Sequence, residues 1–471
     1  MGHGRIAALA AAAALSACGS SGRGNADGSP SSPGSSFGSR GPWPTSNVTY
    51  GSADGIRELP VVGFTTDEAQ NRWVATHDAL YLLRPGDAKF TRFDAAEGLH
   101  LPGNPERYCN DGWAPQTGKC PSGKTPSYGA ADPPGILEIV GGGTNEVFVG
   151  YQGSEPVLAP DGTDVGDPGR HEGKIDRVRL RADGTIQVDR FDLVANNHGG
   201  QYWHDRTVWR LLYDHFVHAH TLYAGTNHGV TVIFPDQFRE PLPGEWFGDA
   251  INVWMGDHLH ARVCFHAPCT TSASNQRMGD WRGLALDAKG DLWHGGKWTA
   301  GLITFDPDPP AWVARNSAAF VIAFGDPYSG PGSANPPVFE PPLEGDEVDI
   351  YAVTVCPDGK VWFASGIPSS YGVASWNGKA FAYYAPSQLG MSESSVADLL
   401  CLPDGRLVAA GFQSGLVLWD PATGASRAID SGNLLPSDAI ERVELDRMVV
   451  PPALHVSTAG GAAVIRPIPG P

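Results

Sequence analysis

Residues 350–386 read IYAVTVCPDGKVWFASGIPSSYGVASWNGKAFAYYAP, and residues 396–430 read VADLLCLPDGRLVAAGFQSGLVLWDPATGASRAID. The two segments follow the same order of short apolar strands and turns. In each, the first strand ends at a Pro-Asp-Gly turn, and further turns separate the three strands that follow. Four short strands joined by tight turns predict an antiparallel sheet, and such a unit cannot bury both of its faces alone.

Five further copies of this pattern occur along the chain, at 61–100, 134–196, 205–240, 282–310 and 437–468. An aromatic residue stands in the second strand of five of the seven copies: Trp73, Phe148, Tyr223, Trp293 and Trp362. Ring closure of seven four-stranded units would bury their faces against one another and remove most free edges. The repeats therefore predict an all-β fold, a seven-bladed β-propeller of four-stranded blades.

The last copy, at 437–468, lacks a fourth strand, and the missing strand stands near the start of the chain. Residues 50–56 (YGSADGI) match residues 93–99 (FDAAEGL), which end the first full copy. We therefore expect the N-terminal segment to add the outer strand of the last blade. Such an interlock would close the ring with both termini in one sheet.

The composition agrees with a fold rich in turns. Of 471 residues, 60 are Gly and 40 are Pro, which argues against a helical bundle because both residues interrupt helices. The 14 Trp, 18 Phe and 13 Tyr can fill a large core, which argues against wholesale disorder. The formal net charge of -18 gives no electrostatic footprint for nucleic acid, so we expect no nucleic-acid partner.

Residues 1–17 predict an export signal. The apolar stretch Ile6–Ala17 is too short for a permanent membrane span. It ends in Leu-Ser-Ala-Cys18, which resembles a bacterial lipobox; the alternative is an ordinary secretory signal with an unrelated Cys. The resemblance implies lipidation at Cys18 and a location in the cell envelope, in the periplasm or at the outer membrane.

Residues 18–42, rich in Gly, Ser and Pro, predict a flexible tether to a propeller at 43–471.

Six further Cys follow Cys18, and an even number permits disulfides in an exported protein. Two pairs close in sequence predict local loop disulfides: Cys109 with Cys120, and Cys264 with Cys269. Cys356 and Cys401 occupy nearly matching places in successive copies. These two either pair across neighbouring sheets or remain two buried thiols.

Three stretches resemble the repeats of two-component regulator propellers: 67–83 (DEAQNRWVATHDALYLL), 90–99 (FTRFDAAEGL) and 287–296 (DAKGDLWHGG). That family forms blades in periplasmic sensor regions of bacterial kinases. The resemblance covers about four blades well, and it implies a propeller with an exported recognition role. The 471 residues contain no kinase pattern, so the resemblance does not carry over a signalling function.

The long insertions are predicted to collect on one end of the propeller, which we call the top face. This face carries the loops between second and third strands and the links between blades. Insertions at 101–133, 241–280 and 325–346 link blades, and 152–172 extends a loop after a second strand. Long loops on a rigid scaffold are a common location of binding sites, although these could also be insertions without a binding role.

Candidate ligand-binding residues follow from this placement of the top face: His77, Arg210, His228, Asp257, His258, His260, Arg282 and His294. His77, His228 and His294 are expected at the ends of second strands, near the channel mouth. Trp209-Arg210 and Trp281-Arg282 recur at the entrance of first strands. The Trp rings either pack between blades or form a ligand platform, and the Arg side chains either contact a ligand or pair with acidic neighbours.

The sequence favours a ligand- or protein-binding module, a monomer whose partner is a glycan, a peptide or another envelope protein. The alternative is a propeller enzyme of the lyase or hydrolase type that uses top-face His and acidic residues. The streptogramin lyases are broadly similar in expected architecture, but share no specific motif with this chain. We expect no cofactor, or in the alternative a divalent metal held by top-face His residues. Catalytic residues and metal ligands are not identified by any motif in the sequence.

Overall fold

The computed structural model describes residues 42–101, 135–153, 173–193, 207–226, 230–237, 253–255, 260–263, 275–278, 281–296, 299–303, 349–366 and 372–470. The described residues belong to one compact unit, Ser39–Pro471. Within these ranges, no helix is long and apolar enough to cross a membrane. The predicted export signal and the loop cysteines lie outside the described residues: Cys18, Cys109, Cys120, Cys264 and Cys269.

The strands form seven blades, numbered along the chain. Blade 1 contains β2 (Val61–Thr66), β3 (Arg72–Thr76), β4 (Leu80–Leu83) and β5 (Thr91–Phe93). Blade 2 contains β6 (Ile136–Gly141), β7 (Glu146–Tyr151), β8 (Gly173–Leu180) and β9 (Ile186–Leu193). Blade 3 contains β10 (Val208–Asp214), β11 (Thr221–Thr226), β12 (Val230–Ile233) and β13 (Val253–Met255).

Blade 4 has three strands in the described part of the chain: β16 (Gly283–Leu286), β17 (Leu292–Gly296) and β18 (Thr299–Ile303). Blade 5 contains β19 (Ile350–Val355), β20 (Val361–Ser365), β21 (Val373–Trp376) and β22 (Phe381–Tyr384). Blade 6 contains β23 (Asp398–Cys401), β24 (Leu407–Ala410), β25 (Leu416–Trp419) and β26 (Ser426–Ile429). Blade 7 contains β27 (Ile440–Asp446), β28 (Ala453–Thr458), β29 (Gly461–Ile465) and β1 (Val48–Tyr50).

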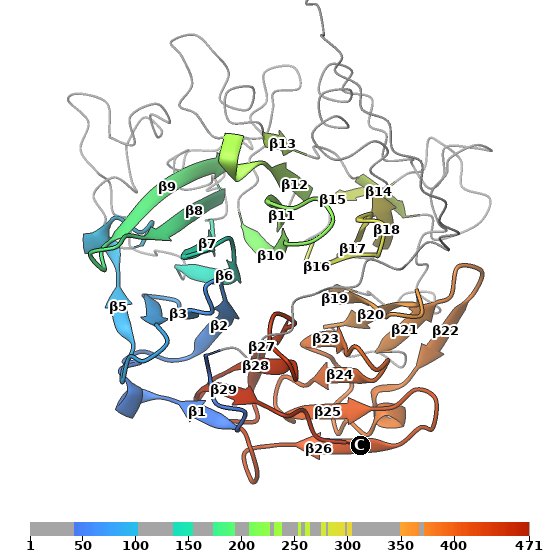
Figure 1. The fold of residues 1–471 in the computed structure, drawn as a ribbon. Coiled ribbons are helices and arrows are strands. Elements are labelled where there is room, and N and C mark those ends of the chain that lie inside the picture. The colour runs from blue at the N-terminus through green and yellow to red at the C-terminus, as the bar shows by residue number, and fades with distance from the viewer. Residues whose placement is uncertain are drawn as a thin grey trace, which may run out of the picture. The chain divides into compact units, whose positions relative to one another are not determined.

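The first strand of every blade lies at the centre of the ring (Figure 1). These strands contact one another in order, from β2 through β6, β10, β16, β19, β23 and β27, and β27 contacts β2 again. Apolar clusters fill the spaces between neighbouring blades, including the space between blades 7 and 1. The predicted seven-bladed β-propeller is confirmed.

The N-terminal strand closes the last blade as predicted. β1 pairs antiparallel with β29, and Tyr50 lies opposite Ala462. The short 3-10 turn after β1 matches the one after β5, since each ends at a glycine with a positive φ, 103° at Gly55 and 99° at Gly98. The sequence match between 50–56 and 93–99 therefore reflects a shared local structure.

The aromatic residue predicted in the second strand is buried between blades. Trp73, Phe148 and Tyr223 are fully inaccessible to solvent. His455 takes the equivalent place in blade 7, opposite Glu444 in the register of β27 and β28. Its ring stacks on Phe64 of blade 1, with ring centres 4.4 Å apart.

Cys356 and Cys401 form a disulfide that joins blades 5 and 6, with the two Cα atoms 5.3 Å apart. Both residues are buried, and each lies near the end of its blade's first strand. Of the two alternatives that the sequence left open, the structure adopts the pairing across neighbouring sheets.

Candidate ligand-binding site

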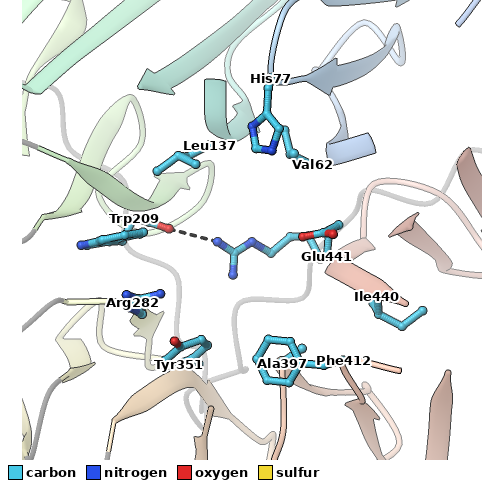
Figure 2. Close-up of a pocket in the computed structure, with 11 residues that line it drawn as sticks. Val62, His77, Leu137, Trp209, Arg282, Tyr351, Ala397, Phe412, Ile440 and Glu441 are labelled. Carbon is cyan, nitrogen blue, oxygen red and sulfur yellow. Dashed lines mark hydrogen bonds between the residues drawn. The ribbon is translucent and has the colours of Figure 1, made fainter. Parts of the chain in front are cut away.

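A pocket of about 280 Å³ lies at the top-face end of the channel (Figure 2). Its lining comes from all seven blades: Val62, His77, Leu137, Trp209, Arg282, Tyr351, Ala397, Phe412, Ile440, Glu441 and Arg442. We call this pocket the cup. His77 and Phe412 follow the second strands β3 and β24, so the cup opens on the predicted top face.

A repeated backbone irregularity supplies much of the cup wall. In the first strands of five blades, the pairing register skips one residue. The skipped residues are Val62, Leu137, Trp209, Tyr351 and Glu441. A bulge of this kind re-aims one side chain, and all five line the cup.

Arg282 stacks with aromatic side chains from the two neighbouring blades. Its guanidinium carbon lies 3.8 Å from the ring centre of Trp209 and 4.4 Å from that of Tyr351. Both distances fall within the range of cation–π attraction. The three side chains form a fixed wall on the side of blades 3 to 5.

The two Trp-Arg pairs of the sequence are offset by one residue in the fold. Arg210 lies opposite Gly225, whereas the equivalent place in blade 4 belongs to Gly283, opposite Gly295. Trp209 and Arg282 therefore occupy equivalent positions in the cup wall. Trp281 is 1% exposed and packs between blades, which was one of the two roles expected for these Trp rings.

Charged side chains from one register position lie beneath the cup. Glu138, Arg210, Asp398 and Arg442 occupy this place in blades 2, 3, 6 and 7. Arg210 forms a bidentate ion pair with Asp398, with both N–O distances at 3.3 Å. Blades 3 and 6 lie on opposite sides of the ring, so this pair crosses the channel.

Arg442 makes a second connection across the channel. Its Nη2 lies 2.6 Å from Glu138 Oε2 and donates a hydrogen bond of 3.0 Å to the Trp209 carbonyl oxygen, the dashed line in Figure 2. Both crossing contacts lie below the rim, and we infer that they form the floor of the cup.

Burial raises the pKa of two carboxyl groups here, Glu138 in the floor and Glu444 two residues beyond Arg442 in β27. The pKa of Glu444 rises to about 8, although its Oε1 accepts a hydrogen bond of 2.7 Å from Thr65 Oγ1. Burial also raises the pKa of Glu138 above its usual range, against the opposing effect of Arg442. Glu444 is therefore largely protonated at neutral pH.

His77 is the described histidine that lines the cup. Its Nδ1 lies 2.9 Å from the Ile136 carbonyl oxygen. A carbonyl oxygen only accepts hydrogen bonds, so this contact places a proton on Nδ1 and leaves Nε2 for other contacts.

His294 is buried within blade 4, whereas the sequence predicted that it lies at the channel mouth. It lies in the middle of β17, opposite Leu284, and its ring centre is 4.5 Å from that of Trp281. Burial lowers its pKa to about 3, so its ring is neutral at physiological pH. The prediction that His294 ends the second strand, as His77 does, is wrong: His294 directly follows Trp293, the residue that aligns with Trp73, whereas His77 stands four residues after Trp73.

The other predicted residues are not brought together by the described structure. His228, Asp257 and His258 lie outside the described residues, and His260 begins β14 (His260–Val263). β14 pairs with β15 (Asn275–Met278) as a separate two-stranded sheet. Within the described ranges, no group of three His, Cys, Asp or Glu could hold a metal ion, so the metal alternative stays a prediction about the remaining loops.

Sequence reasoning missed most of the lining and, apart from Arg210 and its expected pairing with an acidic neighbour, the floor. Tyr351, Phe412, Glu441 and Arg442 were not proposed, nor were the floor carboxylates. A signal was present for the floor, because charged residues recur at one register position of the first strands in four blades.

The fold and the cup define a seven-bladed β-propeller with a polar pocket at the channel mouth. No family model matches the chain, and no curated protein is significantly similar to it in sequence. Among solved structures, it is similar to an extracellular domain assigned to a hybrid two-component system of B. thetaiotaomicron. That similarity has a TM-score of 0.50 and 12% identity, and covers 90% of this chain and 42% of that one.

A second similar structure is a catalytically inactive virginiamycin B lyase from Staphylococcus aureus with quinupristin. It has a TM-score of 0.47 and 9% identity, and the similarity covers 89% of this chain and 97% of that chain. At these identities the similarities concern the fold. The resemblance to two-component propeller repeats is thus matched by a structural neighbour from a two-component system.

Proposed function

We propose that this chain is a cell-envelope protein whose propeller binds a ligand in the cup at its top face. The observation that carries the proposal is the convergence of all seven blades on one concave site that combines stacked aromatic, cationic and apolar side chains. Binding pockets usually pair an apolar lining with a few placed polar groups. The glycan, peptide and envelope-protein partners expected from the sequence remain candidates.

The paired charges beneath the cup support binding rather than catalysis. Arg210 and Asp398 bind each other, and His77 contacts a backbone carbonyl rather than a carboxylate. In the part of the chain that the structure describes, the cup therefore holds no His–carboxylate pair of the kind that acid–base catalysis uses.

A ligand screen by thermal shift tests the proposal. Oligosaccharides and peptides are screened against the protein, and each hit is measured again with Trp209→Ala and Arg282→Ala. Arg84→Ala is the matched control, because Arg84 is exposed and pairs with Asp87 in the turn between β4 and β5. We expect hits that the cup variants lose and the control keeps. Hits that all variants retain would place binding elsewhere.

Envelope anchoring is tested separately. We propose that Cys18 carries the lipid that holds the protein at the membrane, as the lipobox-like LSAC segment implies. Cys18→Ala should move the protein from the membrane fraction to the soluble fraction and abolish labelling by a radioactive fatty acid. Unchanged labelling of the variant would exclude Cys18 as the site.

A further inference from the structure

We propose that the cup binds the carboxylate of a small organic acid whose remaining part is apolar. This inference rests on the proposed binding function and names the chemical class of its ligand. The shared chemistry covers two sources, a free carboxylic acid and the C-terminal residue of a peptide.

The lining of the cup combines cationic and apolar groups. Arg282, Trp209 and Tyr351 form the wall on blades 3 to 5. Blades 6, 7, 1 and 2 contribute the aliphatic side chains of Ala397, Ile440, Val62 and Leu137, and also the polar side chains of His77, Glu441 and Arg442. A ligand with one anionic and one apolar end can contact both kinds of group.

The stacking of Arg282 between two rings determines which polar group of a ligand can bind to it. The rings of Trp209 and Tyr351 occupy the faces of the guanidinium group, whose N–H donors all lie in its plane. A carboxylate is a planar acceptor that matches this edge with two parallel hydrogen bonds. Restraint by the two rings reduces the entropy that Arg282 loses on binding.

Arg442 adds a second cation at the base of the cup. Its Nη2 is engaged by the Trp209 carbonyl oxygen and by Glu138, while its Nε is buried without a hydrogen-bond partner among the described residues. Two guanidinium groups thus line the cup in a chain whose net charge is -18.

Glu441 provides a test of the sign of the charge on the ligand. It is the carboxylate among the described lining residues, and it is exposed at the rim. An anionic ligand would be repelled by Glu441 and attracted by Arg282. Neutralising the two residues should therefore change affinity in opposite directions.

The volume limits the size of the bound group. At about 280 Å³, the cup lies just below the usual range for drug-sized ligands, about 300–1,000 Å³. It therefore suits one ring or one amino-acid residue.

The experiment compares acids with their amides. Cyclohexanecarboxylate and cyclohexanecarboxamide represent the free acid, and Ala-Ala-Leu with a free or an amidated C-terminus represents the peptide. Binding to the full chain is followed by saturation-transfer NMR and titration. We expect an acid to bind at least about tenfold more tightly than its amide, since charge-assisted hydrogen bonds are roughly twice as strong as neutral ones.

Variants then identify the site. Arg282→Gln should weaken acid binding about tenfold, Glu441→Gln should strengthen it about twofold, and Arg84→Gln should leave it unchanged. The acid that binds more tightly identifies the source. Equal affinity for acids and amides overturns the inference, and so does failure of every acid to bind at millimolar concentration. The proposed binding function survives either result if screened ligands still depend on Trp209.

Discussion

Arg210 of blade 3 and Asp398 of blade 6 are 188 residues apart in the chain and form an ion pair across the propeller channel. The Asp398 side chain is fully buried, and its Oδ2 also accepts a hydrogen bond of 3.1 Å from the Val443 amide. One carboxylate therefore connects blades 3, 6 and 7. The pair both fixes the ring and forms part of the cup floor.

Asp398→Asn should lower the free energy of unfolding by about 3 kcal/mol, because it leaves the Arg210 charge buried without its main partner. Urea unfolding measures the loss. The double variant Arg210→Met with Asp398→Leu should recover most of it, since apolar residues of similar volume often replace a buried pair without loss. The single variants Arg210→Met and Asp398→Leu complete the comparison. If the loss of stability in the double variant equals the sum of the losses in these two, the residues do not act as a pair.

Glu444 should make stability depend on pH. Its carboxyl group has a pKa of about 8 in the folded protein and an ordinary value near 4.5, so the folded state holds a proton that the unfolded state has lost. The contribution of Glu444 to stability is therefore complete below about pH 4.5 and declines as pH rises toward 8.

Glu444→Gln should remove this decline while keeping the acceptor for Thr65. We expect the variant to match the parent at pH 4 and to exceed it by at least about 1 kcal/mol at pH 8, as one pKa unit corresponds to about 1.4 kcal/mol. Urea unfolding at both pH values measures the difference. The same pH dependence in both proteins would assign the effect to other groups.

The ring could be predicted from the sequence because every blade carries its own pattern of strands and turns. The matching segments 50–56 and 93–99 even located the closing strand. Each repeat specifies the local structure of one blade. Seven four-stranded blades can bury their faces in few arrangements, and a closed ring is one of them.

The cup could be predicted only in part, because it depends on register and on contacts across the ring. His77 and Arg282 were found through their place near the channel mouth. The skipped residues at Trp209 and Tyr351 cannot be read from an apolar pattern, since a bulge changes the pairing without a fixed residue signature. The Arg210–Asp398 pair depends on blades opposite each other in space, which no local pattern records.

The Cys356–Cys401 disulfide should stabilise the junction of blades 5 and 6. The cysteines are 45 residues apart, and a loop of this length corresponds to about 4 kcal/mol in the chain-entropy model. We expect a variant with Ser at both positions to unfold at lower urea concentration, by about 2–4 kcal/mol. A thiol titration of the denatured, unreduced protein checks the pairing directly: two reactive thiols that map to these positions would exclude the disulfide.

The closing strand β1 should be essential for the stability of blade 7. Tyr50 is buried, its ring centre lies 5.2 Å from that of Phe90, and its hydroxyl group accepts a hydrogen bond from Arg72. Tyr50→Ala should lower the free energy of unfolding by about 3–5 kcal/mol, as is usual when a large aromatic side chain is removed from a core.

Thr49→Ala is the matched control, because Thr49 lies in the same strand with its side chain exposed and pairs with Ala463 through the backbone. Its effect should stay within about 0.5 kcal/mol, as is usual for surface positions. Urea unfolding of the two variants separates the strand's core contacts from its backbone pairing. A similar small loss in both would mean that the ring holds without Tyr50, and that blades 7 and 1 are joined mainly by the contacts of β27 and β28 with β2.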